Sequence, residues 1–545
     1  MAHEPGNTIS DHGGELALAT LRPFGVDTLF TLSGGHVFPV YDAAVKRDPP
    51  TRIVDVRHEQ TATFAAEGYA RLTRRPGLAV LTAGPGVTNG MSAIAQAHFN
   101  GSPVVVLGGR APAARWGSGS LQELDHVPLV APITKLARTA TAVEDIPAVV
   151  HEAAVAALTP HRGPVFVDLP MDVVFAEGEA TIPPAVVAAA AEPDPDQLAR
   201  VAKLVAEAER PMLIAGTDVW WAGAEAELAA AVEHLRVPTF VNGQGRGCLP
   251  ADHPLAASRT RSLLKTEADV VVVVGTPLDF RLSFGRFGAA TVAHLVDSDE
   301  GRAAHIDAIT LAGDLRTALA GFAAYEGPRA DHDPWISHVR DLETSGAATD
   351  AALLAADATP ILPTRVYGEL RARLERDAVV VCDGGDFVSY AGKYVDVFEP
   401  GCWLDSGPYG CLGTGMGYAM AASLVHPDRQ VVALLGDGAA GFSLMDVDTL
   451  VRHQLPVVMV VGNNGIWGLE KHPMQALYGY DVAADLQPGC RYDRVVAALG
   501  GAGEIVTEPG DVGPALDRAL ASGVPYLVNV VTDPADVYPR SSNLG

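Results

Sequence analysis

Short apolar runs alternate with longer alanine-rich stretches along nearly the whole chain. Each run has the length of a strand and ends in small or polar residues, as in PVVVLGG, PVFVDLP, DVVVVVGT, VVALLGDG and PVVMVVGNN. Unbroken apolar runs of this length are typical of parallel strands buried on both faces, each of which delivers a loop at its carboxyl end. Their alternation with helical stretches predicts an α/β protein built from doubly wound parallel sheets.

Two stretches break this rhythm and indicate domain boundaries. Residues 175–197 are rich in Pro, Ala and Glu, and residues 325–363 form a second polar stretch before a new helix at Thr364. A chain of 545 residues has room for about three or four domains of ordinary size. We therefore predict three doubly wound domains, covering residues 1–180, 195–335 and 360–545. Composition does not decide whether the first and third are structurally related.

The charge and the apolar runs exclude several classes of function. The formal net charge of −26 argues against nucleic acid as a partner, because phosphate backbones bind basic surfaces. The five cysteines show no CxxC pair and no zinc spacing, so we interpret them as free thiols. No apolar run reaches membrane-spanning length, and the polar start of the chain lacks the apolar core of a signal peptide. We expect a cytoplasmic protein with no membrane partner.

The strongest chemical signal joins two neighbouring strand ends. One predicted strand ends in Gly436-Asp437-Gly438, and the next one along the chain ends in Asn463-Asn464. Oxygen ligands at one edge of a sheet suit Mg²⁺, which retains phosphate oxygens in its shell. The glycines let the backbone approach a diphosphate, and a following helix N-terminus favours its charge. A GDG turn alone is common, so two ordinary strand-end turns are the competing interpretation; the asparagine pair makes it the weaker one.

This spacing resembles the thiamine diphosphate (ThDP) motif, a GDG followed by an NN. Residues 54–90, VDVRHEQTATFAAEGYARLTRRPGLAVLTAGPGVTNG, are similar to the cofactor-activating segment of the superfamily that contains acetolactate synthase, oxalyl-CoA decarboxylase and 2-hydroxyacyl-CoA lyase. The resemblance extends over essentially the whole chain. It implies a pyrimidine-binding, a central and a diphosphate-binding domain, in that order.

The resemblance also implies roles for particular residues. Glu59 matches the glutamate that hydrogen-bonds the aminopyrimidine ring, whose imino tautomer then deprotonates C2 of the thiazolium. Asp437, Asn464 and the carbonyl of Ile466 match the metal ligands, and Leu412 matches the bulky apolar residue beneath the bent cofactor. The other cofactor-binding residues implied are Gly385, Asp386, Phe387, Gly410, Gly436, Gly438 and Asn463.

Relatives in this superfamily build one cofactor site from two subunits. The resemblance therefore implies a homo-oligomer, a dimer or a tetramer, in which Glu59 and Asp437 serve one site from two chains. Relatives also bind ADP or FAD in the central domain. The segments GTPLDFRLSFG, 275–285, and HLVDSDEGR, 294–302, could hold such a nucleotide through an aspartate at a strand end. A pair of surface turns with solvated carboxylates is the alternative.

The segment after the asparagine pair distinguishes members of the superfamily. In acetolactate synthases this segment resembles NNxxLGMVxQW. This chain has Leu469 and Glu470 at the Met and Val positions and Pro473 at the Trp position. Trp467 and Leu469 are expected in the substrate pocket. A buried carboxylate is costly unless it has a function. We expect Glu470 to be a buried acid/base, the alternative being that it turns outward to Lys471 or solvent.

These differences favour a 2-hydroxyacyl-CoA lyase. Glu470 would take the proton of the substrate 2-hydroxyl while the bond between the thioester carbon and C2 breaks, giving formyl-CoA and a ketone or aldehyde, or the reverse carboligation. Gln122 matches a glutamine near the reacting carbonyl, and His36 lies on a loop where some relatives place a catalytic histidine; a capping histidine is the alternative. Leu121 would help Leu469 to restrict the pocket to short acyl groups.

Two other functions stay open at this point. One is acetolactate synthase, or a related 2-oxo acid decarboxylase or carboligase. The other is a catalytically silent relative that only binds nucleotide or a partner, against which the intact Glu59, GDG and NN argue. No basic cluster marks a site for the phosphates of an acyl-CoA; the candidates are Arg259, Arg261, Lys265 and Arg281.

Overall fold

The N-terminal part of the chain folds around a six-stranded parallel sheet. A computed structural model describes residues 6–538. The strands of this sheet are, in spatial order, β3 (Arg52–Asp55), β2 (Thr28–Thr31), β4 (Gly77–Leu81), β5 (Val104–Arg110), β7 (Val165–Pro170) and β6 (Leu136–Thr139). Its helices are α1 (Gly13–Leu21), α2 (Phe38–Lys46), α3 (Glu59–Thr73), α4 (Pro85–Phe99), α5 (Val127–Val130), α6 (Ile146–Leu158) and α7 (Met171–Val174). An antiparallel pair, β1 (Thr8–His12) and β8 (Glu177–Thr181), joins the two ends of this domain.

Alternating side chains of this sheet enter two separate cores. Leu78 and Val80 of β4 pack with α1, α2 and α6, whereas Ala79 and Leu81 pack with α3 and α4. Both faces are therefore apolar, which is why the strands read as continuous apolar runs in the sequence.

The C-terminal part contains a second six-stranded parallel sheet. Its spatial order is β15 (Trp403–Asp405), β14 (Val379–Asp383), β16 (Val431–Gly436), β17 (Val458–Asn463), β19 (Tyr526–Val531) and β18 (Ala502–Val506). Its helices are α14 (Pro363–Arg371), α15 (Gly385–Ser389), α16 (Ala391–Tyr394), α17 (Thr414–Val425), α18 (Asp437–Ser443), α19 (Val447–Arg452), α20 (Gly468–Tyr478), α21 (Tyr492–Ala498) and α22 (Val512–Ala521). Numbered along the chain, both sheets have the strand order 2-1-3-4-6-5, so the first and third domains share one topology.

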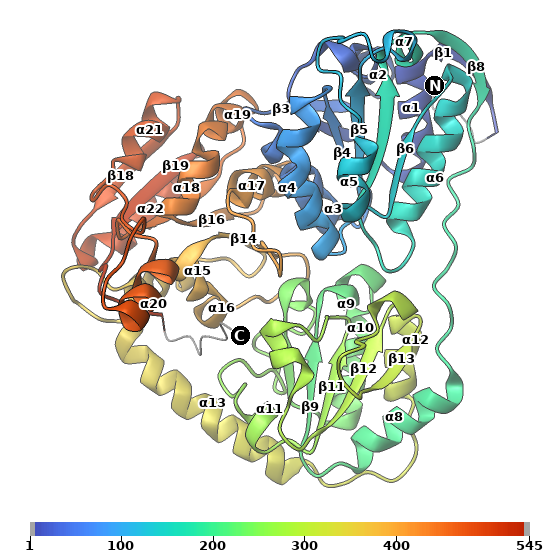
Figure 1. The fold of residues 1–545 in the computed structure, drawn as a ribbon. Coiled ribbons are helices and arrows are strands. Elements are labelled where there is room, and N and C mark those ends of the chain that lie inside the picture. The colour runs from blue at the N-terminus through green and yellow to red at the C-terminus, as the bar shows by residue number, and fades with distance from the viewer. Residues whose placement is uncertain (1–5, 539–545) are drawn as a thin grey trace.

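The central part is smaller and has its own sheet. Five parallel strands lie in the order β10 (Thr239–Val241), β9 (Pro211–Ala215), β11 (Val270–Val274), β12 (Thr291–Val296) and β13 (Ile309–Ala312). The helices here are α8 (Pro195–Glu207), α9 (Thr217–Ala222), α10 (Glu225–Leu235), α11 (Leu263–Thr266) and α12 (Leu315–Ala323). Three parallel sheets with helices around them confirm the predicted fold class (Figure 1). No helix within residues 6–538 is both long and apolar enough to cross a bilayer.

Helices α3 and α17 join the first domain to the third. A Cβ atom at Gly417 would lie 2.8 Å from the Cβ of Phe64, and one at Gly68 would lie 3.0 Å from the ring of Tyr418. The two glycines thus let the helix backbones approach closely. The apolar core on this side is continuous from β4 through α3 and α17 to β16, so the two sheets enclose one shared layer of helices (Figure 1).

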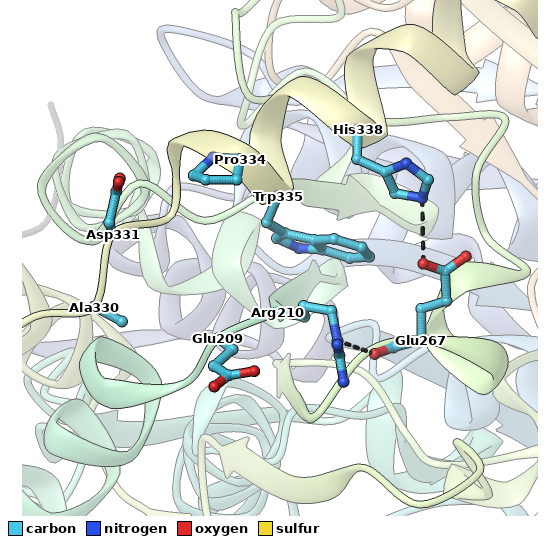
Figure 2. A pocket seen from close by; sticks show the side chains of 8 residues that line it. All are labelled: Glu209, Arg210, Glu267, Ala330, Asp331, Pro334, Trp335 and His338. Carbon is cyan, nitrogen blue, oxygen red and sulfur yellow. Dashed lines mark hydrogen bonds and ion pairs between the residues drawn. The ribbon is translucent and has the colours of Figure 1, made fainter.

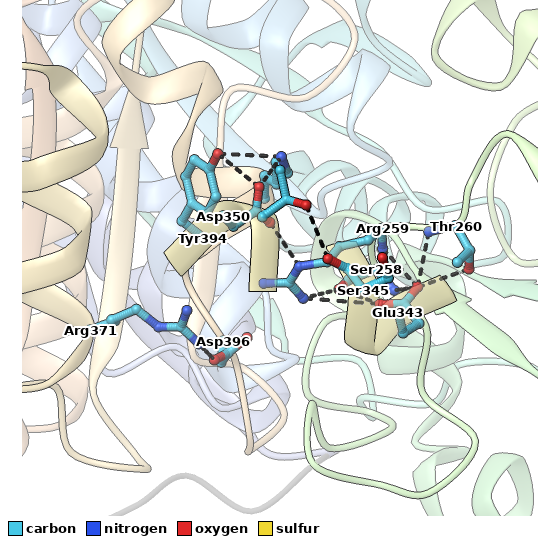
Figure 3. Close-up of polar contacts among 11 residues, drawn as sticks. Ser258, Arg259, Thr260, Glu343, Ser345, Asp350, Arg371, Tyr394 and Asp396 are labelled. Carbon is cyan, nitrogen blue, oxygen red and sulfur yellow. Dashed lines mark hydrogen bonds and ion pairs between the residues drawn. The ribbon is translucent and has the colours of Figure 1, made fainter. Parts of the chain in front are cut away.

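The stretch 325–363 is not the simple polar connection that the sequence predicts. It contains α13 (Asp333–Leu354), a 22-residue helix. Figure 3 shows how this helix ties the central domain to the C-terminal one. The Glu343 carboxylate accepts from the Ser258 and Thr260 backbone N–H groups at 3.0 and 2.9 Å, and the Asp350 carboxylate accepts from Arg259 Nε at 2.9 Å. The polar residues of the stretch serve these contacts.

Candidate functional site

The GDG and NN turns lie side by side at the carboxyl edge of the C-terminal sheet. Strands β16 and β17 are parallel neighbours in which Gly436 pairs with Gly462. The backbone N–H of Gly465 donates to Asp437 Oδ2 over 2.7 Å and links the two turns directly. The strand order reverses between β14 and β16, and ligands of doubly wound sheets bind at such switch points.

Asp437 is a buried carboxylate that forms no salt bridge with any side chain of residues 6–538. It is only 3% exposed, and its other oxygen accepts from the Gly438 N–H at 2.9 Å. Burial raises the pKa of Asp437 to about 6, and the negative charge of Asp386 acts in the same direction. A cation placed here would relieve both penalties, so the donor set fits Mg²⁺.

Asn463 and Asn464 have different hydrogen-bond partners. Asn464 Nδ2 donates to Asp386 Oδ2 at 3.0 Å, while its Oδ1 accepts the Ile466 N–H at 3.2 Å. Asn463 instead points into the domain, where its Nδ2 donates to Cys490 O at 2.9 Å and Asn529 Oδ1 at 3.0 Å. Asn464 thus belongs to the oxygen cluster with Asp386, and Asn463 braces the strand end behind it.

Aromatic rings pack against the glycines of these turns. A Cβ at Gly438 would lie 2.4 Å from the Trp467 ring, and one at Gly462 would lie 2.3 Å from Phe387. Phe387 is fully buried in the core of the domain. Its packing against Gly462 therefore holds the turn before α15 in place. The sequence motif alone did not distinguish this packing role from a contact with the cofactor.

Backbone space is open where the resemblance places the cofactor. A Cβ at Gly385 or Gly410 would meet no atom of the described part of the chain, residues 6–538, within 4 Å. Gly384, at φ +78°, allows a close approach of Leu412, since a Cβ there would lie 2.7 Å from Leu412 Cδ2. The residues present therefore fit a bound diphosphate cofactor, with open backbone at the switch point and Leu412 beside it.

Asp383 holds the Leu412 loop from below and was missed in the sequence. This fully buried carboxylate accepts from the Gly413 N–H at 3.0 Å and the Gly415 N–H at 2.8 Å. Burial raises the pKa of Asp383 to about 7 against the effect of these donors. Its place immediately before the glycines of the CDGGDF segment was the only signal available.

Glu59 begins α3 and is 6% exposed. Its Oε2 accepts from Asn89 Nδ2 at 3.0 Å, and the neighbouring Gln60 donates to the Leu412 carbonyl at 3.2 Å. A single chain thus brings the start of α3 against the Leu412 loop. The sharing of one site between two chains, expected from the resemblance, stays a prediction.

His36, Leu121 and Gln122 gather around the turn after β4. His36 Nδ1 lies 3.2 Å from Thr82 Oγ1, and burial lowers the pKa of His36, which a hydrogen bond to the Leu121 backbone partly offsets. Gln122 has a left-handed backbone, φ +60°, against Gly84. The Leu121 side chain is 78% exposed in the single chain, so it does not crowd an enclosed pocket there.

A buried dyad fixes the same turn and was not predicted. The Gly84 N–H donates to His126 Nε2 at 2.9 Å, so the imidazole proton faces Asp168 from Nδ1, also at 2.9 Å. Arg110 completes the network with a 2.6 Å contact to Asp168. His126 therefore positions the turn that carries Gly84 and has no lone pair left for catalysis.

The expectation of a buried Glu470 is wrong. Glu470 lies in the first turn of α20 and is exposed in the single chain. The apolar strand ends at Asn463, and the chain has left the core before it reaches this residue. Lys471, its suggested alternative partner, pairs with Asp481 at 3.1 Å and with Asp485 at 2.5 Å. Leu469 and Trp467 are half-buried beside it.

In the central domain, the aspartates at which a nucleotide was expected each contact a basic side chain through at least one oxygen. Asp279 pairs with Arg281 at 2.7 Å, and Asp297 lies 3.3 Å from His161. A separate hollow of about 500 Å³ is drawn in Figure 2. Arg210, which lines it, precedes β9, so the hollow lies at the amino edge of the sheet; Glu209, Glu267 and Asp331 make it acidic. That position and charge do not suit phosphates.

Comparison with known proteins decides the family. Domain models described as the N-terminal TPP binding domain, central domain and C-terminal TPP binding domain of thiamine pyrophosphate enzymes match residues 11–129, 198–322 and 383–530. The chain belongs to the thiamine pyrophosphate enzyme family. Thiamine pyrophosphate is ThDP, and the chain is accordingly a ThDP-dependent carbon–carbon carboligase or lyase.

Named relatives fall into two groups. The chain is 54% identical over 539 residues to a probable acetolactate synthase of Mycobacterium bovis and to acetolactate synthase large subunit IlvG of Mycobacterium tuberculosis, covering 98% of each sequence. It is 34% identical to 2-hydroxyacyl-CoA lyase 2 of Caenorhabditis elegans, over 96% of this chain and 90% of the relative. The human protein of that name is 32% identical over 98% of this chain and 92% of its own length.

Proposed function

We propose that this enzyme is a ThDP- and Mg²⁺-dependent lyase that cleaves short 2-hydroxyacyl-CoA to formyl-CoA and a ketone or aldehyde, or runs the reverse carboligation. The observation that carries the proposal is the segment after the asparagine pair. In acetolactate synthases, Met, Val and Trp in this segment form an apolar receptor. At the same three positions this chain has Leu469, Glu470 and Pro473. Pro473 lies inside α20, and Glu470 presents a carboxylate in its first turn.

The charge of Glu470 supports a neutral thioester over a 2-oxo acid. A carboxylate beside the site repels an anionic substrate, and its exposed position at the start of α20 suits the entrance of the site. An acid/base at that entrance can take a proton from the 2-hydroxyl of the substrate and return it. The similarity to the 2-hydroxyacyl-CoA lyases points to the same substrate class.

The roles of the other residues follow from their positions. When bound, ThDP supplies a nucleophilic carbon and an electron sink. Asp437, Asn464 and the Ile466 carbonyl would hold Mg²⁺ at the carboxyl edge of the sheet. Glu59, oriented by the 3.0 Å bond from Asn89, would hold and release the proton exchanged with the pyrimidine ring. Leu412, braced through Asp383, would set the shape of the site.

Acetolactate synthesis is the second candidate, and the 54% identity to proteins with that name favours it. A homo-oligomer with shared sites, a cytoplasmic location and a nucleotide in the central domain remain predictions from the sequence. A product screen separates the two candidates: purified enzyme with ThDP and Mg²⁺ is given either a 2-hydroxyacyl-CoA or pyruvate, and the products are identified by mass. Formation of acetolactate with no cleavage of any acyl-CoA would overturn the lyase proposal.

Glu470→Gln tests the acid/base role directly. The amide retains size and hydrogen bonding but cannot carry the proton, so cleavage should fall about tenfold or more, with less change in KM. Glu508→Gln, an exposed glutamate elsewhere in the same domain, is the matched control and should behave like the wild type. Equal rates in both variants would remove Glu470 from the mechanism.

A further inference from the structure

Three ionisable side chains from two domains converge away from the cofactor site. His161 lies between α6 and β7 of the N-terminal domain. Asp218 is in the first turn of α9, directly after β9, and Asp297 directly follows β12. Strands β9, β11 and β12 are parallel neighbours, so both aspartates leave the same edge of the central sheet. Figure 1 shows α9 at the end of the central domain that faces the N-terminal one.

The spacing of the three side chains is that of metal ligands. His161 Nδ1 lies 3.3 Å from Asp297 Oδ1 and 3.8 Å from Asp218 Oδ1, and one ligand atom of each residue lies within 4.8 Å of the others. Two ligands at about 2.1 Å from one tetrahedral ion are about 3.4 Å apart. Small side-chain movements would therefore bring all three atoms onto one ion.

The cluster also includes buried oxygen atoms that have no hydrogen-bond partner within residues 6–538. Asp218 and Asp297 are 8% and 7% exposed. Within residues 6–538, the second oxygen of Asp297, Oδ2, is buried without a hydrogen-bond partner, and so is Ser298 Oγ beside it. Buried oxygens without partners are costly, and two at one strand end indicate that something further binds there.

The neighbouring charged side chains limit which ligand could bind to these oxygen atoms. Arg162 is the nearby guanidinium that interacts with both carboxylates. Lys135 Nζ is occupied by the Thr159 and His161 carbonyls at 2.7 and 2.6 Å. Arg162 and His161 are therefore the basic side chains that face the two carboxylates.

We propose that His161, Asp218 and Asp297 bind a divalent transition-metal ion that joins the N-terminal and central domains. One imidazole with two carboxylates suits Zn²⁺ or Mn²⁺, whereas Mg²⁺ and Ca²⁺ take all-oxygen sites. The ion would bind neutral His161 at Nδ1 and displace its proton. Ser298 Oγ or a water would take the fourth position. The site is distinct from the one at Asp437, which holds oxygen ligands only.

The experiment uses the full-length protein, stripped with a chelator and free of ThDP. Zn²⁺ and Mn²⁺ are titrated separately at pH 7.5 by calorimetry, and the retained metal is counted per chain after dialysis. An Asp437→Ala background removes the expected Mg²⁺ site. We expect one ion per chain in that background and at least tenfold weaker binding after either His161→Gln or Asp297→Asn. His151→Gln, a histidine of α6 outside the cluster, is the matched control and should bind like the background.

Two results would overturn the proposal. One is an unchanged stoichiometry and affinity in His161→Gln, with folding verified by circular dichroism. The other is no ion retained at a hundredfold excess of either metal. In the second case the cluster is an ion pair between the His161 imidazolium and the two carboxylates. Anomalous diffraction from a Zn²⁺-soaked crystal gives an independent answer, since density without an anomalous signal at Asp297 identifies a water.

Discussion

Replacement of Asp383 by asparagine tests how the structure positions the Leu412 loop. Asp383 is fully buried, and its pKa is raised to about 7 from an ordinary value of 3.8. In the unfolded chain this carboxyl is ionised above pH 4, whereas in the folded chain it stays protonated until about pH 7. The folded state therefore loses stability as the pH rises through this window.

The size of the effect follows from the shift. Each pKa unit corresponds to about 1.4 kcal/mol, so ionising Asp383 should lower the free energy of unfolding by roughly 2–3 kcal/mol between pH 5 and pH 8. Asparagine does not titrate. It also places its NH2 donor opposite the N–H donor of Gly413 or Gly415, a cost of about 1–3 kcal/mol that does not depend on pH. The variant should thus be less stable than the wild type at pH 5 and should recover relative to it at pH 8.

The assay is urea denaturation of the cofactor-free protein at both pH values, followed by circular dichroism. Asp428→Asn, an exposed aspartate of the same domain, is the control and should show no pH-dependent difference. ThDP affinity of Asp383→Asn should fall because the Leu412 loop is no longer held by the Gly413 and Gly415 hydrogen bonds. A constant difference between Asp383→Asn and wild type at both pH values would refute the reasoning and show that the backbone donors keep Asp383 ionised throughout.

Three further outcomes are expected from the cofactor site. Glu59→Gln should lower turnover by about 10²–10⁴ while calorimetry shows ThDP binding retained, and a loss below tenfold would contradict the proton-relay role. Asp437→Ala should abolish Mg²⁺-dependent ThDP binding, so an unchanged affinity in the same titration would exclude it as a ligand. Mixing these two inactive variants under conditions that exchange subunits should restore about a quarter of wild-type activity if Glu59 and Asp437 serve one site from two chains; no recovery would assign each site to a single chain.

The sequence alone determined the α/β class and the joining of the two motif turns. Strands buried on both faces must be apolar throughout, so they are visible without any knowledge of their neighbours. Asp437 and Asn464 follow consecutive strands of the C-terminal domain, and consecutive strands in such folds are usually adjacent, so their proximity could be predicted from spacing. The same spacing carried the resemblance that the comparisons confirmed at the level of the family.

The tertiary structure decided everything that depends on residues far apart in the chain. The apolar pattern ends with β17 and says nothing about the direction of the chain beyond it, which is why a buried pocket position is expected for Glu470 although it lies exposed on α20. The stretch that holds α13 looks like a linker because its helix lies between two domains and buries little apolar surface. In the sequence, Asp383 and His126 resemble ordinary polar residues. Their roles are visible only in the folded chain, where each contacts the loop that it holds. His161 meets Asp218 and Asp297 only because two domains pack together, and local sequence carries no record of a contact whose partners lie in different domains.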